Sequence, residues 1–289
     1  MSAAAPPQPG GGLEVVTAPA RRGRVSARAS ALYDVPGPWA RRRNLVLSVV
    51  GVGLALAGLW WVWSTLDSQG IFDERRWDVF SDPVTWQGLL RGLWATLRAA
   101  GVAAVLAAVL AIGVAAWRRA SSRPLRWSAT IVVELLRGVP VVLMMLFVLL
   151  VLRTSPFVAV VTGLTLYNAV VLGEILRAGL ESLPRGQREA GAALGLRPVQ
   201  VFTLIELPQA LRTMLPSLVS QLVVLLKDTS LGFIVSYPEL LRQVRTLSEF
   251  FGNRYLFSVF FVGAGMYLAV NITVSRFAAW LERRTARGR

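Results

Sequence analysis

The segment EAGAALGLRPVQVFTLIELP, residues 189–208, interrupts an otherwise strongly apolar chain with charged residues, glycines and prolines. It lies between two long apolar runs. The residues before it, Leu183-Pro184-Arg185-Gly186, end the first run because proline and glycine break helices. Packed helices need only about two to eight residues to connect them. The length of the segment therefore indicates a role beyond turning the chain.

Two short helices are expected within this segment. Arg188–Leu194 can form the first, with Gly195 as its C-terminal stop. Pro198 suits the first turn of a second helix that runs to Leu207, before Pro208.

The first of these helices is edged by small residues, namely Ala190, Gly191, Ala192 and Ala193. A thin surface of this kind fits a groove on a partner. A helix lying on the membrane surface would need a larger apolar face. The residues alone therefore favour docking to a partner protein.

The composition is that of a membrane protein. Of 289 residues, 54% are hydrophobic, the mean hydropathy is +0.54 and the formal net charge is +15. On a soluble protein this charge would suggest nucleic acid. Here the arginines lie at the ends of apolar runs, which indicates membrane orientation and contact with anionic lipid headgroups instead.

Several kinds of chemistry are excluded by the residues that are missing. The chain has no cysteine and no histidine, which excludes disulfides, thiolate nucleophiles, Ser-His-Asp triads and Cys/His metal sites. It also lacks the G-x-x-x-x-G-K-[ST] loop that binds ATP phosphates. We expect no enzymatic activity, no metal and no cofactor bound by this chain.

Six apolar runs approach the roughly 20 residues that a helix needs to cross a bilayer. Glycine and alanine recur in them, as close helix packing in lipid favours. We therefore expect an all-α polytopic membrane protein. The runs are Leu45–Leu66, Thr96–Trp117, Ala129–Leu152, Phe157–Leu176, Met214–Ser236 and Tyr255–Trp280.

Arginine is unevenly distributed over the connections between these runs. Both tails and the second and fourth connections are rich in arginine, whereas the first connection carries five acids against two arginines and the third carries Arg153 alone. Cytoplasmic loops hold the excess of basic residues. Both termini and the loop 183–208 are therefore expected in the cytoplasm.

The expected organisation has five parts. They are a disordered basic tail (1–43), a transmembrane helix (44–66), an extracytoplasmic loop (67–85), a transmembrane domain (86–282) and a second basic tail (283–289).

Two segments outside the apolar runs have helical periodicity. Thr85–Arg98 fits either a helix on the outer interface or an early start of the second span. Tyr237–Asn253 is expected to form a short amphipathic helix at the outer surface.

The spacing within residues 189–208 resembles the EAA loop of permease subunits of bacterial ABC importers. That pattern is Glu-Ala-Ala, three residues, Gly, nine residues, Ile, one residue and Leu-Pro. Gly191 departs from it, because the family has a second alanine there; the residue stays small but has a lower helix propensity. The resemblance implies that the matching residues couple the chain to an ATPase: Glu189, Ala190, Gly191, Gly195, Ile205, Leu207 and Pro208.

The resemblance covers about residues 86 to 280 and is to the polar amino acid branch of these importers. It rests on GLWATL (92–97), ELLRGVP (134–140), EILRAGL (174–180) and KDTSL (227–231). It implies a type I ABC importer permease fold with a core of five helices plus the added N-terminal one. That added helix and ALYDVPGP (31–38) resemble actinobacterial glutamate permeases.

The function implied by the resemblance is ATP-driven import of polar amino acids, glutamate in particular, across a bacterial cell membrane. The implied partners are two ATPase subunits that bind ATP and Mg²⁺, a second permease subunit (self or sister), an extracytoplasmic substrate-binding protein and membrane lipids. The alternative is a free-standing channel or secondary carrier, in which the loop is a gate or a connector. Inverted repeats, frequent in secondary carriers, are not evident in the sequence.

Ionisable groups within the apolar runs are candidates for the substrate pathway, because they are costly in a membrane. Lys227 and Asp228 are either a gate or a pair that snorkels or bonds to a neighbouring helix. Thr229 and Ser230 either donate to a substrate carboxylate or hydrogen-bond back to their own helix.

Other polar residues in the runs have structural alternatives. Tyr167 and Asn168 either line the pathway or join helices. Glu134 and Arg137, three residues apart, are expected to form a structural salt bridge. Glu174 and Arg177 are expected to be structural and to lie on the cytoplasmic side, next to the loop.

Overall fold

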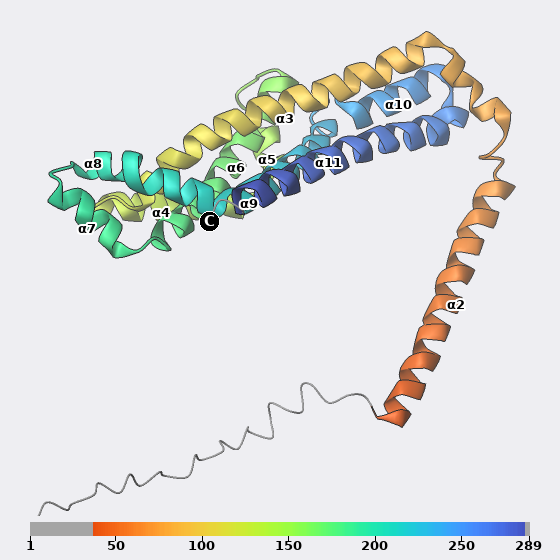
Figure 1. Cartoon of the computed structure of the whole chain (residues 1–289). Coiled ribbons are helices and arrows are strands. Elements are labelled where there is room, and N and C mark those ends of the chain that lie inside the picture. The colour runs from red at the N-terminus through yellow and green to blue at the C-terminus, as the bar shows by residue number, and fades with distance from the viewer. Residues whose placement is uncertain (1–36, 287–289) are drawn as a thin grey trace, which may run out of the picture. The chain divides into compact units, whose positions relative to one another are not determined.

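The computed structural model describes residues 37–286 and divides into two units, one ending at Leu66 and the other beginning at Asp67 (Figure 1). The described part of the first unit is formed by α2 (Pro38–Ser68), most of whose side chains are exposed. Most of the tail expected to be disordered lies outside the described residues. However, α2 begins within it, so Arg41, Arg42 and Arg43 are helical.

Five helices in the described part of the chain are long and apolar enough to cross a membrane, or six if one bent pair counts as a single span. The all-helical architecture is confirmed. The five span segments are Trp39–Ser68, Pro83–Arg118, Pro156–Glu181, Pro198–Phe233 and Asn253–Leu281.

The second unit begins with two short 3-10 helices, η1 (Glu74–Arg76) and η2 (Asp78–Ser81), in the connection after α2. The long helix α3 (Pro83–Arg118) follows, with the Asp82 carboxylate accepting from the Val84 N–H at 2.8 Å. Thr85–Arg98 belongs to this continuous helix. It is thus an early start of the span and not a separate interfacial helix.

The third apolar run is broken in two, whereas the sequence predicted one span over Ala129–Leu152. The helices α4 (Arg123–Gly138) and α5 (Val141–Leu150) are bent by 93° at their junction. The cause is Pro140, which forces Val139 into extended backbone (φ −86°, ψ 125°).

The salt bridge expected on α4 is not formed. Glu134 and Arg137 are both exposed, and no ion pair joins them in the described residues. This prediction was wrong.

The segment after α6 (Pro156–Glu181) and α7 (Arg185–Ala193) also differs from expectation. A single turn, α8 (Pro198–Gln200), leads through a π-helical turn, η3 (Val201–Glu206), directly into α9 (Leu207–Asp228). The second short helix predicted to stop before Pro208 is therefore the first part of a span. Proline lacks an N–H and its ring crowds the carbonyl four residues earlier, so a widened π turn just before Pro208 lets the helix continue.

The next elements lie at the end of the bundle away from α7, and the last helix runs back from there along the bundle (Figure 1). A 3-10 turn, η4 (Thr229–Phe233), ends the α9 span, and α10 (Leu240–Phe251) follows. Leu240, Val244 and Leu247 are buried on one face, which confirms the amphipathic helix. The 3-10 turn η5 (Asn253–Tyr255) then leads into α11 (Leu256–Ala286), which includes Arg283 and Arg284 of the expected basic tail.

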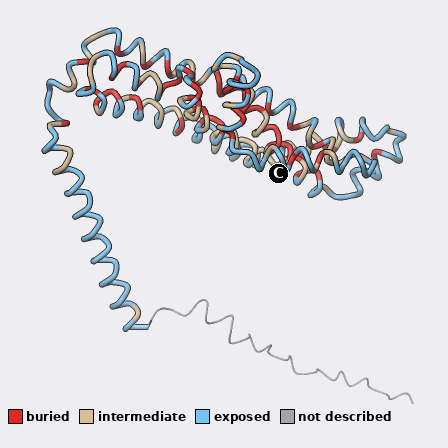
Figure 2. The backbone as a smooth tube through the Cα atoms, turned by 180° about the vertical axis from the view of Figure 1, so that it is seen from behind, coloured by how far each residue is buried: buried red, intermediate tan, exposed pale blue. Residues whose placement is uncertain are grey.

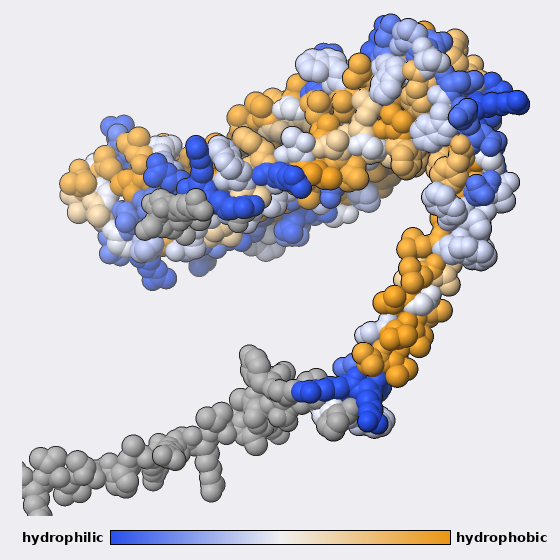
Figure 3. Space-filling model, turned by 45° about the vertical axis from the view of Figure 1, so that its right-hand side comes forward, coloured by the Kyte–Doolittle hydropathy of each residue, from blue (hydrophilic) through white to orange (hydrophobic). Residues whose placement is uncertain are grey.

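The core of the second unit is built on close contact between α3 and α6. Every fourth residue of one stripe of α3 is an alanine with no exposed surface, from Ala99 to Ala115. Small side chains let backbones approach closely in lipid, and a Cβ added at Gly173 of α6 would lie 2.7 Å from Val114 of α3. Buried residues follow the axis of the bundle (Figure 2), while hydrophilic residues gather toward its two ends (Figure 3).

Candidate functional site

The helix α7 has a well-defined end. The Gly195 N–H donates to the Ala192 carbonyl (3.0 Å) and the Leu196 N–H to the Gly191 carbonyl (3.2 Å), which is the hydrogen-bond pattern of a Schellman motif. Gly195 has φ +76°, a left-handed conformation that glycine adopts without strain. The expected helix and its glycine stop are thus present in the structure, although α7 begins at Arg185 and not at Arg188.

The departure at Gly191 has a packing reason. Gly191 is buried against the π-helical turn, and a Cβ added there would lie 2.9 Å from Val201 and 3.0 Å from Ile205. Such distances require the neighbouring side chains to move. Glycine therefore lets α7 lie closer to the turn than alanine would.

One buried carboxylate joins α7, the π-helical turn and the end of α3. Glu206 Oε2 lies 3.2 Å from Arg119 Nη1, and Glu206 Oε1 lies 3.3 Å from Arg119 Nη2 and 3.1 Å from Arg188 Nε. The Glu206 side chain is only 6% exposed. Hydrogen bonds between charged groups are the strong ones. We call this group, Arg119, Arg188 and Glu206, the arginine–glutamate clamp.

Three large apolar side chains near α7 are exposed at this end of the bundle. Leu194, Val199 and Leu204 are 79%, 71% and 66% exposed. Glu189 and Ala190 are exposed as well, and Glu189 makes no ion pair among the described residues. Exposed apolar side chains grouped on one surface mark contact sites for other proteins or membranes.

A cavity of about 660 Å³ lies beneath α7, between the π-helical turn and the end of α3. Arg119, Arg188 and Glu206 contribute to its wall beside Val201 and Phe202. The clamp therefore bridges a gap between elements that are otherwise not fully packed.

Among the candidate pathway residues, Asn168 joins two helices. It has no exposed surface, its Nδ2 donates to the Leu164 carbonyl (2.8 Å), and its Oδ1 accepts from Gln221 Nε2 of α9 (3.0 Å). Tyr167 is half-buried beside the central core. One turn before Asn168, the buried Thr165 hydroxyl has no hydrogen-bond partner among the described residues.

The other pathway candidates lie near the far end of α9. The Thr229 hydroxyl donates to the Leu226 carbonyl (2.7 Å) and the Ser230 hydroxyl to the Lys227 carbonyl (2.9 Å). Lys227 is exposed and Asp228 half-buried, and neither forms an ion pair among the described residues. In this structure the two hydroxyls thus bond back to their own helix.

Glu239 caps α10 and is completely buried. Its carboxylate accepts from the Leu241 N–H (2.9 Å) and the Arg242 N–H (2.7 Å). Burial raises its pKa to about 7, although these two backbone hydrogen bonds oppose the rise. The same junction is held to α3 by the Tyr237 hydroxyl, which donates to the Ala95 carbonyl (2.9 Å).

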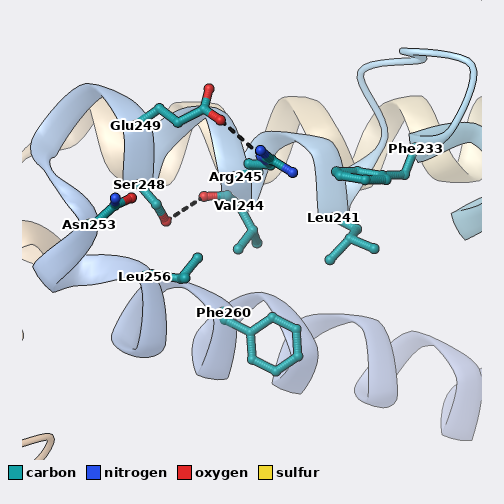
Figure 4. Close-up of a pocket in the computed structure, with 9 residues that line it drawn as sticks. All are labelled: Phe233, Leu241, Val244, Arg245, Ser248, Glu249, Asn253, Leu256 and Phe260. Atoms are coloured by element: carbon teal, nitrogen blue, oxygen red, sulfur yellow. Dashed lines mark hydrogen bonds and ion pairs between the residues drawn. The ribbon is translucent and has the colours of Figure 1, made fainter.

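A cavity of about 410 Å³ lies beside α10, between that helix and the start of α11 (Figure 4). Arg245 and Glu249 form an ion pair at its rim (2.8 Å), and Arg245 also lies over the Phe233 ring, 5.9 Å from its centroid. Leu256 and Phe260 form the opposite wall. This end of the bundle thus carries a half-polar hollow, opposite the end that carries α7.

Four residues of these sites were not found from the sequence. Glu206 falls on the unspecified position between Ile205 and Leu207 of the motif, so spacing gave no reason to select it. The others are Arg119, Gln221 and Glu239, whose partners are 87, 53 and as few as two residues away along the chain. No group of three or more acidic residues that could hold a metal occurs in the part of the chain that the structure describes.

Comparison with known proteins gives a family match. The family described as "Binding-protein-dependent transport system inner membrane component" matches residues 98–287. This range contains α7, the clamp and the pathway candidates.

Two relatives and one solved structure illustrate the similarity. The glutamate transport system permease protein GluD of Corynebacterium glutamicum is 37% identical over 234 residues, covering 78% of this chain and 85% of that protein. The probable glutamine ABC transporter permease protein GlnP of Bacillus subtilis is 34% identical over 205 residues, covering 69% and 92%. A crystal structure of an amino acid ABC transporter with histidines superposes with a TM-score of 0.63 at 24% identity, covering 72% of this chain and 98% of that one.

Proposed function

The chain belongs to the family of binding-protein-dependent transport system inner membrane components, and on this premise we propose that it admits glutamate and is driven by an ATPase docked on α7. It is an integral membrane protein with the type I ABC importer permease fold and a permease subunit of an amino acid ABC importer. The choice of glutamate, the docking on α7 and the partners belong to the proposal.

The observation that carries the proposal is the surface of α7 and its neighbours. Leu194, Val199 and Leu204 are exposed, on a segment whose arginine content supports a position in the cytoplasm. Exposing apolar side chains to water is unfavourable, and burying them against another protein removes that cost. A groove that accepts small residues such as Ala190 would provide this burial. An ATPase subunit in the cytoplasm fits this requirement.

The clamp gives a route by which docking could move the membrane helices. Arg188 lies on α7, Glu206 leads directly into α9, and Arg119 directly follows the last residue of α3. A displacement of α7 would therefore pull on two spans at once. If the ATPase binds α7 differently in its open and closed states, that difference in binding free energy biases the permease between two conformations.

Glutamate is proposed because the relative at 37% identity is named as a glutamate permease. The relative at 34% identity is named for glutamine, so the two substrates share the amino acid backbone and differ in side-chain charge. Uptake of labelled glutamate by the reconstituted importer, with unlabelled glutamine or glutamate as competitor, separates them. Glutamate is expected to compete at least about tenfold more strongly.

The proposed setting is a bacterial cell membrane with both termini in the cytoplasm. ATP and Mg²⁺ would bind to the ATPase partner, and this chain would hold no cofactor. A second permease subunit, identical or a sister, and an extracytoplasmic substrate-binding protein would complete the importer. The rival function, a free-standing channel or secondary carrier, would transport without any ATPase.

The test is Glu189→Lys, because Glu189 is exposed and makes no ion pair with any residue that the structure describes. We expect the variant to insert and melt like the wild type, while co-purification of the ATPase and ATP-dependent uptake fall at least tenfold. Glu74→Lys makes the same charge change at an exposed acid in η1 and serves as the matched control for ATPase binding. Wild-type ATPase binding and uptake by Glu189→Lys would refute docking on α7, and uptake without ATPase would establish the rival.

A further inference from the structure

Four arginines surround a second cavity at the end of the bundle that carries α7. This cavity, of about 400 Å³, is lined by Arg118, Arg123, Arg126 and Arg177, with Trp127 and Thr130. It lies where α3 ends, α4 begins and α6 passes beside them. Arg118 is next to Arg119 of the clamp, so the cavity and α7 share one end of the molecule. We call it the arginine cavity.

Among the described residues, only two of the four arginines that line this cavity have an acidic partner. Glu174 contacts Arg118 at 2.8 Å and Arg177 at 3.0 Å, and Arg177 also reaches the exposed Glu181. Arg126 donates to the carbonyls of Ala120 and Ser121 instead of to an acid. Arg123 is exposed and has no acidic partner among the described residues.

The two unneutralised arginines are also badly placed for the helix that carries them. Arg123 and Arg126 lie in the first turn of α4, which holds no acidic residue. Positive charge at a helix N-terminus is unfavourable, because the helix dipole already places partial positive charge there. An anion in the arginine cavity would relieve this repulsion.

An exposed apolar stripe leads away from the arginine cavity along α4. Trp127, Ile131 and Leu135 are spaced four residues apart, on one face of the helix. They are 72%, 48% and 62% exposed. Tryptophan is enriched at the interface between membrane and water. We therefore expect Trp127 to lie at the boundary between the lipid headgroups and the acyl chains.

We propose that the arginine cavity binds the phosphate of an anionic phospholipid whose acyl chain lies along the stripe Trp127–Ile131–Leu135. Basic pockets between transmembrane helices on the cytoplasmic side suit such headgroups. A free phosphate ion would use the arginines but leave the stripe uncovered. Neither the amino acid substrate nor the ATPase takes part in this lipid binding. Lipid binding can therefore be tested independently of the proposed function.

The test measures lipid binding to the purified full-length protein in uncharged detergent by native mass spectrometry. The probes are phosphatidylglycerol and phosphatidylcholine with identical acyl chains. We expect wild type to bind phosphatidylglycerol at least about tenfold more tightly. Arg123→Glu should lower that affinity by about tenfold to thirtyfold without changing the affinity for phosphatidylcholine.

The matched control is Arg42→Glu, the same charge reversal at an exposed arginine near the start of α2. It should retain the preference for phosphatidylglycerol, because Arg42 is not among the residues that line the arginine cavity. An equal loss in both variants would overturn the proposal, since it would show general attraction to positive charge. If Arg123→Glu failed to fold, judged by its melting curve, Arg126→Gln would give the same comparison.

Two further results would also overturn the proposal. Glycerol 3-phosphate, which has no acyl chain, binding as tightly as phosphatidylglycerol would show a site for a soluble anion. Efficient disulfide formation between Trp127→Cys in two copies of the chain within the membrane would show that a second subunit covers the stripe. Weak binding of glycerol 3-phosphate and no cross-link would support a lipid.

Discussion

Glu206 shows how one side chain can connect a short helix to the end of a long one. It is nearly buried, yet it faces two guanidinium groups from different elements. A buried carboxylate without such partners would be strongly unfavourable. The buried Glu206 carboxylate is therefore stabilised by its ion pairs with Arg119 and Arg188. These ion pairs also hold α7 against the end of α3.

We predict that Glu206→Gln loosens α7 without unfolding the membrane helices. Loss of the charge leaves Arg119 and Arg188 facing a neutral group, at a cost of about 2 kcal/mol. Spin labels at Arg185→Cys and Ser121→Cys should show a broader distance distribution in this variant. In the reconstituted importer, less substrate should be transported per ATP hydrolysed.

The control for this change is Glu181→Gln. Glu181 pairs with Arg177 at 2.6 Å but its side chain is 57% exposed, and exposed pairs contribute at most about 1 kcal/mol. It should leave both the distance distribution and the transport stoichiometry unchanged. If the distance distribution in Glu206→Gln were as narrow as in the wild type, packing alone would hold α7.

Glu239 gives the protein a predicted pH dependence. Its pKa is about 7 in the folded protein against an ordinary value of 4.5. Between these values the folded state binds a proton that the unfolded state has released, so stability falls as the pH rises from about 4.5 to 7. At 1.36 kcal/mol per pKa unit the loss is at most about 3 kcal/mol.

The measurement is the melting temperature of the purified protein at pH 5.5 and pH 8. Wild type should melt lower at pH 8, and Glu239→Gln, which stays neutral, should show a smaller difference. An unchanged pH dependence in Glu239→Gln would assign it to other groups.

At the scale of elements, the fit of α7 against the π-helical turn depends on Gly191. The neighbouring Val201 and Ile205 leave no room for a large side chain there. By contrast, Gly186 in the first turn of α7 is exposed and has no atom within 4 Å of an added Cβ. The two glycines therefore form a natural pair for testing contact against helix propensity.

We predict that Gly191→Leu separates α7 from the turn, whereas Gly186→Leu does not. Leucine gains roughly 0.8 kcal/mol of helix propensity over glycine at either site, but at Gly191 the clash outweighs this gain by about 1–3 kcal/mol. Limited proteolysis between α7 and α9 should accelerate only in Gly191→Leu, with a parallel loss of ATPase binding. Equal proteolysis rates in the two variants would contradict the packing explanation.

The sequence predicted elements well where local chemistry decides them. Gly195 is a helix stop because its left-handed conformation is needed there, and the apolar period of Tyr237–Asn253 became α10. The prediction failed where two local rules competed. Pro140 broke an apolar run that was long enough to span the membrane. Pro208 did not end its helix, because a π-helical turn just before it accommodates the proline ring.

The sites were less predictable than the elements, since their contacts join distant parts of the chain. The spacing from Glu189 to Pro208 selects a segment but does not identify Glu206, whose partner Arg119 lies 87 residues earlier. Asn168 could be selected as a polar residue in an apolar run, yet its partner Gln221 lies 53 residues away. Only the packing of α6 against α9 reveals that pair.

At the scale of the whole molecule, both the family match and the buried clusters of the described residues lie within the second unit. The family match covers residues 98–287, and the core clusters all lie beyond Asp67. In contrast, α2 carries exposed apolar side chains along its length, including Trp60, Trp61 and Trp63. Its composition suits a span that touches lipid.

We therefore predict that deleting residues 1–66 leaves a chain that still folds, inserts and binds the ATPase, because a unit with its own core can fold alone. Its stability should change by less than about 1 kcal/mol, measured as the melting temperature of the purified protein.

The orientation of the shortened chain should persist, since Arg118, Arg119, Arg123 and Arg126 lie at or just beyond the end of α3 and should keep that end in the cytoplasm. Labelling of Ser121→Cys by an impermeant thiol reagent reports this, and the residue should react only after the membrane is opened. Labelling in intact cells would show that α2 sets the topology, and loss of ATPase binding would show that it belongs to the transport core.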